Sequence, residues 1–187
     1  MKKSLLCLSL GLLAAGAAQA QTYYVSQNFN AVSAPSLPSS WASSPSGQWA
    51  TGVPNDIITV AASAGVSFND ANHMDAVAIN GNNASANGAI LELPSFSLAS
   101  SATNATIVYD ISFYGFHISN NTSLAESMAL VVSTDGGSTW SNVQTISANT
   151  NSAWETHTIN IGSYAGQSNL IFGFKYGNSG AALVGVA

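Results

Sequence analysis

Four acidic residues stand in or beside apolar, strand-like segments, and pairs of such carboxylates can hydrolyse glycosidic bonds. They are Glu92, Asp110, Glu126 and Glu155. A glycosidase needs one carboxyl group as an acid and a second as a nucleophile or base. A chain with eight acidic residues brings two together easily by chance, and the alternative interpretation of each is a place on the solvated face of a sheet. A glycosidase or lyase that uses paired carboxylates is one alternative function.

Oxygen ligands also gather in a short segment, where Asp70, Asn72 and Asp75 lie within six residues. Carboxylate and amide oxygens are the ligands that Ca²⁺ prefers. The segment is no EF-hand loop, because Met74 takes the fifth position and the turn glycine is missing. The sequence predicts a structural calcium ion near this segment or near Glu126, with a simple solvated acidic loop as the alternative. No other cofactor is expected.

Aromatic side chains could supply flat platforms for sugar rings beside the many Asn, Asp and Ser residues. The candidates for this ligand-binding role are Trp41, Trp49 and Tyr114. Trp140 and Trp154 are expected to pack in or over the core instead, which is the commoner place for tryptophan in a small sandwich.

The sets of residues that other enzymes use are incomplete. The three histidines are scattered and the only cysteine is Cys7, so no zinc-ligand spacing is present. The run 177–181 resembles a nucleophile elbow around Ser179, but neither an acid nor a histidine follows it. We therefore expect a protein that is not an enzyme and has no catalytic residues.

The run 133–140, Ser-Thr-Asp-Gly-Gly-Ser-Thr-Trp, fits the pattern S-x-D-x-G-x-x-W that is called an Asp box. An aspartate can accept N–H groups of its own turn, and glycine permits a positive φ. The pattern predicts a β-hairpin that Trp140 folds back to cover. Its structural residues are Ser133, Asp135, Gly137 and Trp140. Sialidases carry several such boxes and bind their substrate with arginines, whereas this chain has one box and no arginine.

The elements that must position these residues are strands. Alternation of apolar and polar residues predicts strands over 23–29, 57–61, 76–79, 89–93, 107–113, 128–132, 143–147, 154–161 and 170–176. A bulge near Gly115 would explain a change of parity after the fifth of these. Alternation along the last of them predicts that Lys175 points outward. The Ser- and Pro-rich segment 33–46 is expected to be an irregular loop. Many alternating strands without a helix predict an all-β, two-sheet antiparallel sandwich.

The first 20 residues have the features of a secretory signal peptide: Lys2 and Lys3, an apolar run over 5–15, and Ala18-Gln19-Ala20. The run is too short to span a membrane, so no membrane insertion is expected after cleavage. Residues 21–187 are predicted to form one domain. Loss of two lysines takes the net charge from −5 to −7 and leaves Lys175 as the one basic residue, which excludes nucleic acid as a partner.

Several segments resemble the MAM-like jelly-roll domains of bacterial surface proteins, of the cleaved-adhesin and choice-of-anchor J types. They are the opening residues Phe29, Asn30, Pro38 and Trp41, the runs 91–94, 107–116 and 128–140, Trp154 with the run 161–167, and the run 172–176. The resemblance implies a jelly-roll sandwich, export and a non-catalytic binding role. It also implies that Asn30 stands where the family has a carboxylate that helps to hold calcium. The family continues beyond a segment like 181–187, so the resemblance implies a jelly roll that lacks its last strand.

Together these features predict an exported, non-catalytic adhesion or binding module at the bacterial cell surface or matrix. Its partner is expected to be a surface glycan or a protein. The alternatives are an accessory carbohydrate-binding module of a larger secreted hydrolase or protease, and the paired-carboxylate glycosidase or lyase.

Overall fold

The computed structural model describes residues 23–52, 76–79, 87–113, 127–147 and 153–177. Within these residues, the regular elements are strands apart from the 3₁₀ turn η2 (Gly162–Tyr164). The strands are β1 (Ala42–Ser44), β2 (Trp49–Gly52), β3 (Ala76–Ile79), β4 (Ile90–Glu92), β5 (Thr106–Ile111), β6 (Ser127–Ser133), β7 (Ser141–Ile146), β8 (Glu155–Asn160) and β9 (Ile171–Gly177). Over the same residues, no helix has the length and apolar character that crossing a membrane requires.

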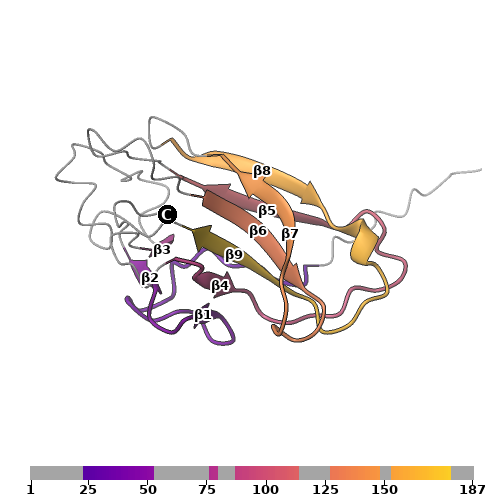
Figure 1. Cartoon of the computed structure of the whole chain (residues 1–187), viewed down its shortest axis with the longest axis horizontal. Helices are drawn as coiled ribbons and strands as arrows, with labels where there is room; N and C mark the ends of the chain where they lie inside the picture. Colours follow the sequence, from indigo (N-terminus) through magenta and orange to yellow (C-terminus); the bar gives the residue numbers. More distant parts are fainter. Residues whose placement is uncertain (1–22, 53–75, 80–86, 114–126, 148–152, 178–187) are drawn as a thin grey trace, which may run out of the picture.

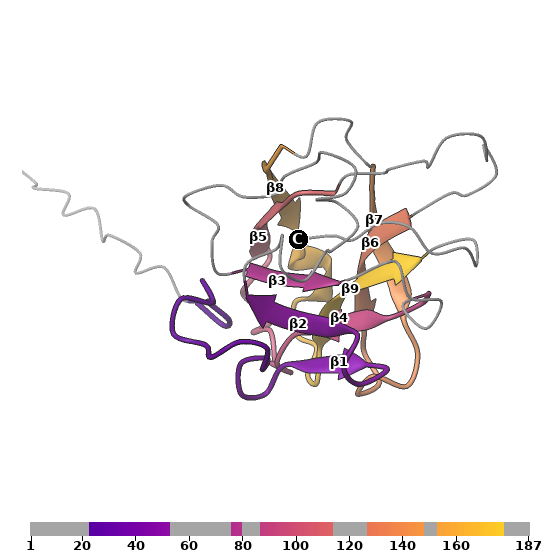
Figure 2. The same ribbon diagram turned by 90° about the vertical axis from the view of Figure 1, so that its left-hand side faces the viewer.

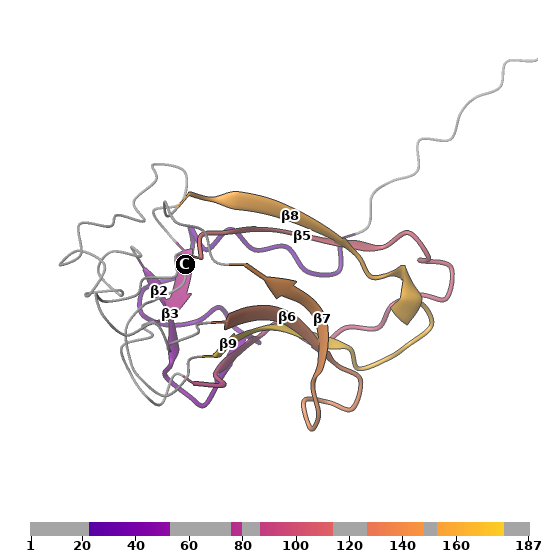
Figure 3. The same ribbon diagram turned by 45° about the horizontal axis from the view of Figure 1, so that its top comes forward.

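The strands form two facing layers. One layer is a five-stranded antiparallel sheet in the order β1-β4-β9-β6-β7, and the antiparallel pair β5-β8 covers it as the other (Figures 1 and 3). A third pair, β2-β3, lies across one end of the sandwich (Figure 2). The predicted fold class of an all-β antiparallel sandwich is confirmed.

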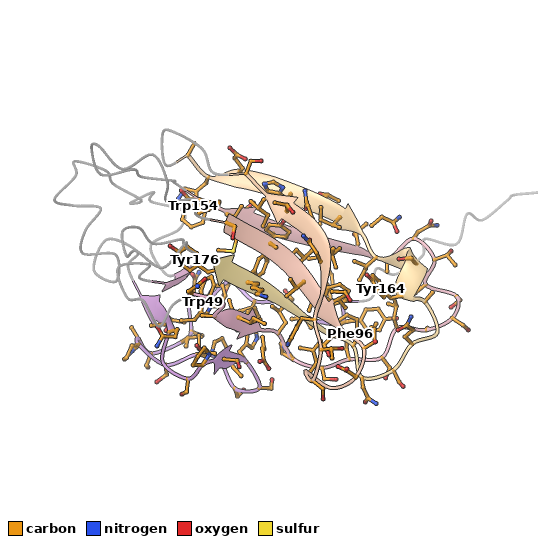
Figure 4. The ribbon with its side chains drawn as sticks, viewed as in Figure 1. Trp49, Phe96, Trp154, Tyr164 and Tyr176 are labelled. Carbon is orange, nitrogen blue, oxygen red and sulfur yellow. The ribbon has the colours of Figure 1, made fainter. Side chains whose placement is uncertain are left out.

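The space between the layers is filled by two apolar clusters. The first contains Trp49, Leu91, Phe113, Met128 and Tyr176, and the second contains Leu98, Leu130, Ile161, Leu170 and Phe172, among others. Tyr109 and Phe174 pack against both clusters. Figure 4 shows Trp49 and Tyr176 toward one end of the sandwich and Phe96 and Tyr164 toward the other.

Most of the predicted strands that fall on described residues are present. The strand 76–79 has the predicted ends, and β4 to β9 lie within or close to the predicted ranges. The predictions for 57–61 and for a bulge at Gly115 lie outside the described residues. A register shift is found elsewhere, between Leu130 and Val131 in the pairing of β6 with β7.

The predicted strand over 23–29 is wrong. The side-chain amide oxygen of Gln27 accepts the backbone N–H groups of Asn28 and Phe29, at 2.9 and 2.7 Å. Phe29 has a φ of 62°, which turns the chain out of an extended path. Local side-chain hydrogen bonds therefore replace the ladder that alternation suggested.

The segment 33–46 is not entirely irregular, because it ends in β1, and β2 follows soon after. Ser43 joins the two strands. Its hydroxyl donates to the carbonyl of Pro45 at 2.6 Å and accepts the N–H groups of Gln48 and Trp49, both at 3.1 Å. This bracing fixes the tight connection that lets β1 pair with β4 and β2 with β3.

Candidate binding site

The three predicted ligand-binding aromatics do not form a surface platform. Trp49 is only 4% exposed and belongs to the core, so the prediction of an exposed ring is wrong for this residue. Trp41 is partly buried against the same cluster, with the ring of Phe29 meeting it edge-on at 5.4 Å. Tyr114 lies outside the described residues. The core, rather than a ligand site, brings Trp41 and Trp49 together.

The predicted calcium ligands can be placed only in part. Asn30 is exposed, and its backbone N–H donates to the side chain of Asn28 at 3.3 Å. The others, Asp70, Asn72, Asp75 and Glu126, lie outside the described residues. In the part of the chain that is described, no three His, Cys, Asp or Glu side chains gather as a metal site would require. Calcium binding therefore stays a prediction.

Three of the four acids considered for catalysis lie on different faces. Glu92 alternates with the core residue Leu91 and so points away from the facing layer. Asp110 lies on the outer side of β5, where its Oδ1 accepts the hydroxyl of Thr156 at 2.6 Å. Glu155 lies on the inner side of β8, with Oε2 at 3.6 Å from Nε2 of His157. These three carboxylates therefore cannot pair, and Glu126 is outside the described residues.

The side of the five-stranded sheet that points away from β5 and β8 carries a mixed set of side chains, and we call it the outer face. The strand registers align its residues in two rows across β1, β4, β9, β6 and β7. One row is Ala42, Glu92, Gly173, Val131 and Asn142, and the other is Ser44, Ile90, Lys175, Ala129 and Thr145. The residues between them on each strand, such as Leu91, Phe174 and Leu130, point into the core.

The turn between β6 and β7 is closed by its own side chains. The buried hydroxyl of Ser133 donates to Oδ1 of Asp135 at 2.7 Å and accepts the N–H of Gly137 at 2.7 Å. The carboxylate of Asp135 accepts the N–H and the hydroxyl of Thr139, at 2.9 and 2.6 Å. The Thr139 hydroxyl and N–H, followed by the Ser133 hydroxyl, lower the pKa of Asp135 to about 2. These hydrogen bonds fix the conformation of the turn that directly precedes Trp140.

The ring of Trp140 lies across the outer face. A Cβ added to Gly173 would come within 3.3 Å of Cζ3 of Trp140, and one added to Gly137 within 4.0 Å of Cζ2. The indole therefore reaches from the turn to the central strand β9, over a position that carries no side chain. Part of the ring remains exposed, so it presents an aromatic surface beside the polar residues of the first row.

Two apolar residues of the outer face are buried although they belong to neither core cluster. Ile90 is 7% exposed and Val131 is 4% exposed. A Cβ on Gly173 would meet Cγ2 of Ile90 at 2.7 Å as well as the indole. The indole therefore lies over Gly173 beside Ile90, which gives Trp140 a structural role as a cover at this point of the sheet.

Polar side chains lie close to Gly173 in the strand registers, on the same face as the indole. Lys175 is exposed and Glu92 is partly exposed. Among the described residues, neither side chain forms an ion pair or a side-chain hydrogen bond. The amide of Asn142 donates to the hydroxyl of Thr145 at 3.0 Å. The outer face therefore offers an aromatic surface, a cationic donor, an anionic acceptor and an oriented amide within two neighbouring rows.

Sequence reasoning found only part of this arrangement. Alternation along β9 predicts that Lys175 points outward, which is confirmed. The position of Trp140 was not predictable, because it depends on Gly173. That residue is 33 positions away in the sequence, and the pairing of β6 with β9 is what brings it close to the turn.

A second polar group lies between the layers. The ring of Tyr109 on β5 stacks on His157 of β8 at 5.2 Å and meets Phe174 of β9 edge-on at 4.8 Å. Its hydroxyl donates to the side chain of Gln144 on β7 at 3.2 Å, and burial raises the pKa of Tyr109 to about 12. Because one side chain contacts residues of three other strands, we interpret this group as a link between the layers.

Comparisons with known proteins found few similarities. No protein-family model matches the sequence, and no curated protein matches it. Among solved structures, a family 22 carbohydrate-binding module, the C-terminal one of Clostridium thermocellum Xyn10B, aligns with a TM-score of 0.41 and 12% identity. The alignment covers 88% of each chain. A likeness at this level does not establish a common ligand.

Proposed function

We propose that this protein is a non-catalytic carbohydrate-binding module and that its ligand lies on the outer face of the five-stranded sheet. The observation that carries the proposal is the partly exposed indole of Trp140 over Gly173, next to Glu92 and Lys175.

The chemistry of the outer face suits a sugar. A sugar ring has an apolar face of C–H groups and an edge of hydroxyl groups, so it is recognised by an aromatic surface combined with a few oriented polar groups. Trp140 would stack against the C–H face. Glu92 would accept a hydroxyl hydrogen, Lys175 would donate to an oxygen, and Asn142 could do both.

The rest of the proposal concerns where the module acts. The features of residues 1–20 support export, and the resemblance to MAM-like domains supports a place at the bacterial cell surface or in the matrix, with adhesion as the result of binding. The same module beside a secreted hydrolase or protease would hold that enzyme on its substrate. A structural calcium ion is part of either version.

The test is a binding measurement with a matched pair of variants. Purified protein would be titrated with a panel of soluble polysaccharides, neutral and acidic. Replacement of a tryptophan at the centre of a binding surface costs about 2 kcal/mol or more, so we expect Trp140→Ala to weaken binding by roughly 30-fold. The control is Val108→Ala on the outer side of β5, where Val108 is 61% exposed, and its affinity should be unchanged.

Two results would contradict the proposal. One is a Trp140→Ala variant that binds as tightly as the wild type, which would leave Trp140 with only its structural role over Gly173 and Ile90. The other is a folded wild-type protein that binds no polysaccharide of the panel but hydrolyses one.

A further inference from the structure

We infer that the ligand is an acidic glycan and that the ammonium group of Lys175 contacts one of its carboxylate or sulfate groups. The inference rests on the proposed function, since it names the class of sugar that the same outer face would bind.

The first step is the distribution of positive charge. The chain has three basic side chains and no arginine, and two of the three are Lys2 and Lys3 at its start. Lys175 is the remaining one, and it lies on β9, the central strand of the five-stranded sheet. The molecule therefore has its one cationic group beyond residue 3 on the face that carries Trp140.

The second step is that this group is available. Lys175 is exposed, and its neighbours across the sheet are Ile90 on β4 and Ala129 on β6. Neither neighbour has a polar side-chain atom that could accept a hydrogen bond from the ammonium group. Glu92 lies one row away on β4 and forms no ion pair with it.

The third step is what such a group recognises best. Hydrogen bonds in which a charged donor meets a charged acceptor are shorter and roughly twice as strong as those between neutral groups. A neutral sugar would leave this advantage unused, whereas a uronate carboxylate or a sulfate would use it. Glu92 would then accept a hydroxyl group, so the ligand should carry its charges at intervals rather than densely.

The charge of the whole protein predicts how the affinity for an acidic glycan depends on salt. The chain is acidic, with a formal net charge of −5 that becomes −7 when Lys2 and Lys3 are removed with residues 1–20, so it repels a polyanion at long range. Salt screens this repulsion over about 8–10 Å at physiological ionic strength, while a direct contact is screened much less. Affinity for an acidic glycan should therefore fall little, or even rise, between low and physiological salt. A basic patch would show the opposite trend.

The experiment compares one polymer with and without its charge. The wild type, Lys175→Gln and Lys175→Arg would be titrated with polygalacturonate and with the fully methyl-esterified polymer, and alginate, sulfated carrageenan and neutral xylan would complete the panel. We expect the wild type to bind at least one of the anionic polymers tenfold or more tighter than its neutral counterpart. Lys175→Gln should lose that preference and Lys175→Arg should keep it. Carboxylated and sulfated polymers distinguish the two sources of the anion.

The outcomes separate this inference from the proposed function. Binding of neutral polymers with equal or greater affinity, or a preference for anions that Lys175→Gln retains, would overturn the inference and leave the proposed function standing. A correctly folded wild type that binds no polymer at all would overturn both.

Discussion

The two sides of β9 differ in burial and in chemistry. Phe172 and Tyr176 on the inner side are fully buried, and Phe174 meets Tyr109 of the facing layer. On the outer side, Gly173 leaves room for an indole and Lys175 extends into solvent. The inner side of this strand therefore stabilises the core, and its outer side presents groups that can contact a ligand. Substitutions on the two sides should therefore change different measurements.

The largest expected effect is on the inner side. Phe172 stacks on Phe96 at 5.9 Å and meets Tyr164 edge-on at 5.6 Å. Phe172→Ala would remove these contacts and leave a cavity, which costs about 3–5 kcal/mol. Thermal unfolding would show a Tm lower by roughly 10 °C. The matched control is Lys175→Gln on the outer side, which should change the free energy of unfolding by no more than about 0.5 kcal/mol. Equal destabilisation by both changes would contradict the division between the two sides.

A smaller effect is expected at the link between the layers. Tyr109→Phe removes the hydrogen bond to Gln144, which contributes about 0.5–1.5 kcal/mol at neutral pH. Because burial raises the pKa of Tyr109 from 10.0 to about 12, the unfolded state loses this proton first. The wild type should therefore lose stability as the pH rises from 10 toward 12.

Denaturant unfolding at pH values between 9 and 11 would measure this loss, and Tyr109→Phe should reduce its steepness. An identical alkaline slope in the two proteins would show that Tyr109 does not titrate as its buried position implies.

The smallest effect is expected in the turn that carries Trp140. Hydrogen bonds from Thr139 and Ser133 lower the pKa of Asp135 from 3.8 to about 2. Its contribution to stability is therefore present above pH 3.8 and lost as the pH falls toward 2. Asp135→Asn should lower the Tm slightly at pH 6, and the difference from the wild type should shrink over that acid range. A difference that is constant with pH would argue against the charged form of Asp135 as the stabilising species.

The comparison also shows what alternation can and cannot reveal. Period two along 170–176 was sufficient to predict β9 and to place Lys175 outward, because a strand in a two-layer fold has one apolar side. The same reasoning failed for 23–29, where the side chain of Gln27 bonds to the local backbone. It also missed β1 and β2, which are short and are defined by the hydroxyl of Ser43 and by pairing with distant strands.

The candidate site was harder to predict than the fold. Exposure of an aromatic residue cannot be read from its type, so the sequence predicts a surface position for Trp49 although it lies in the core. The pattern 133–140 is local, so it predicts only that Trp140 covers its own hairpin. Its position over Gly173 depends on strand order β9-β6-β7 and on a missing side chain in another strand. Such cross-strand relations follow only from the register.

The most direct test of the central claim is nuclear magnetic resonance mapping of the bound surface. A polysaccharide fragment that binds would be titrated into ¹⁵N-labelled protein. We predict that the largest shifts fall on the indole N–H of Trp140 and on the backbone amides of Glu92, Gly173 and Lys175, with little change over Thr106–Ile111 and Glu155–Asn160. Shifts that are confined to β5 and β8 and leave the Trp140 indole unchanged would contradict the claim.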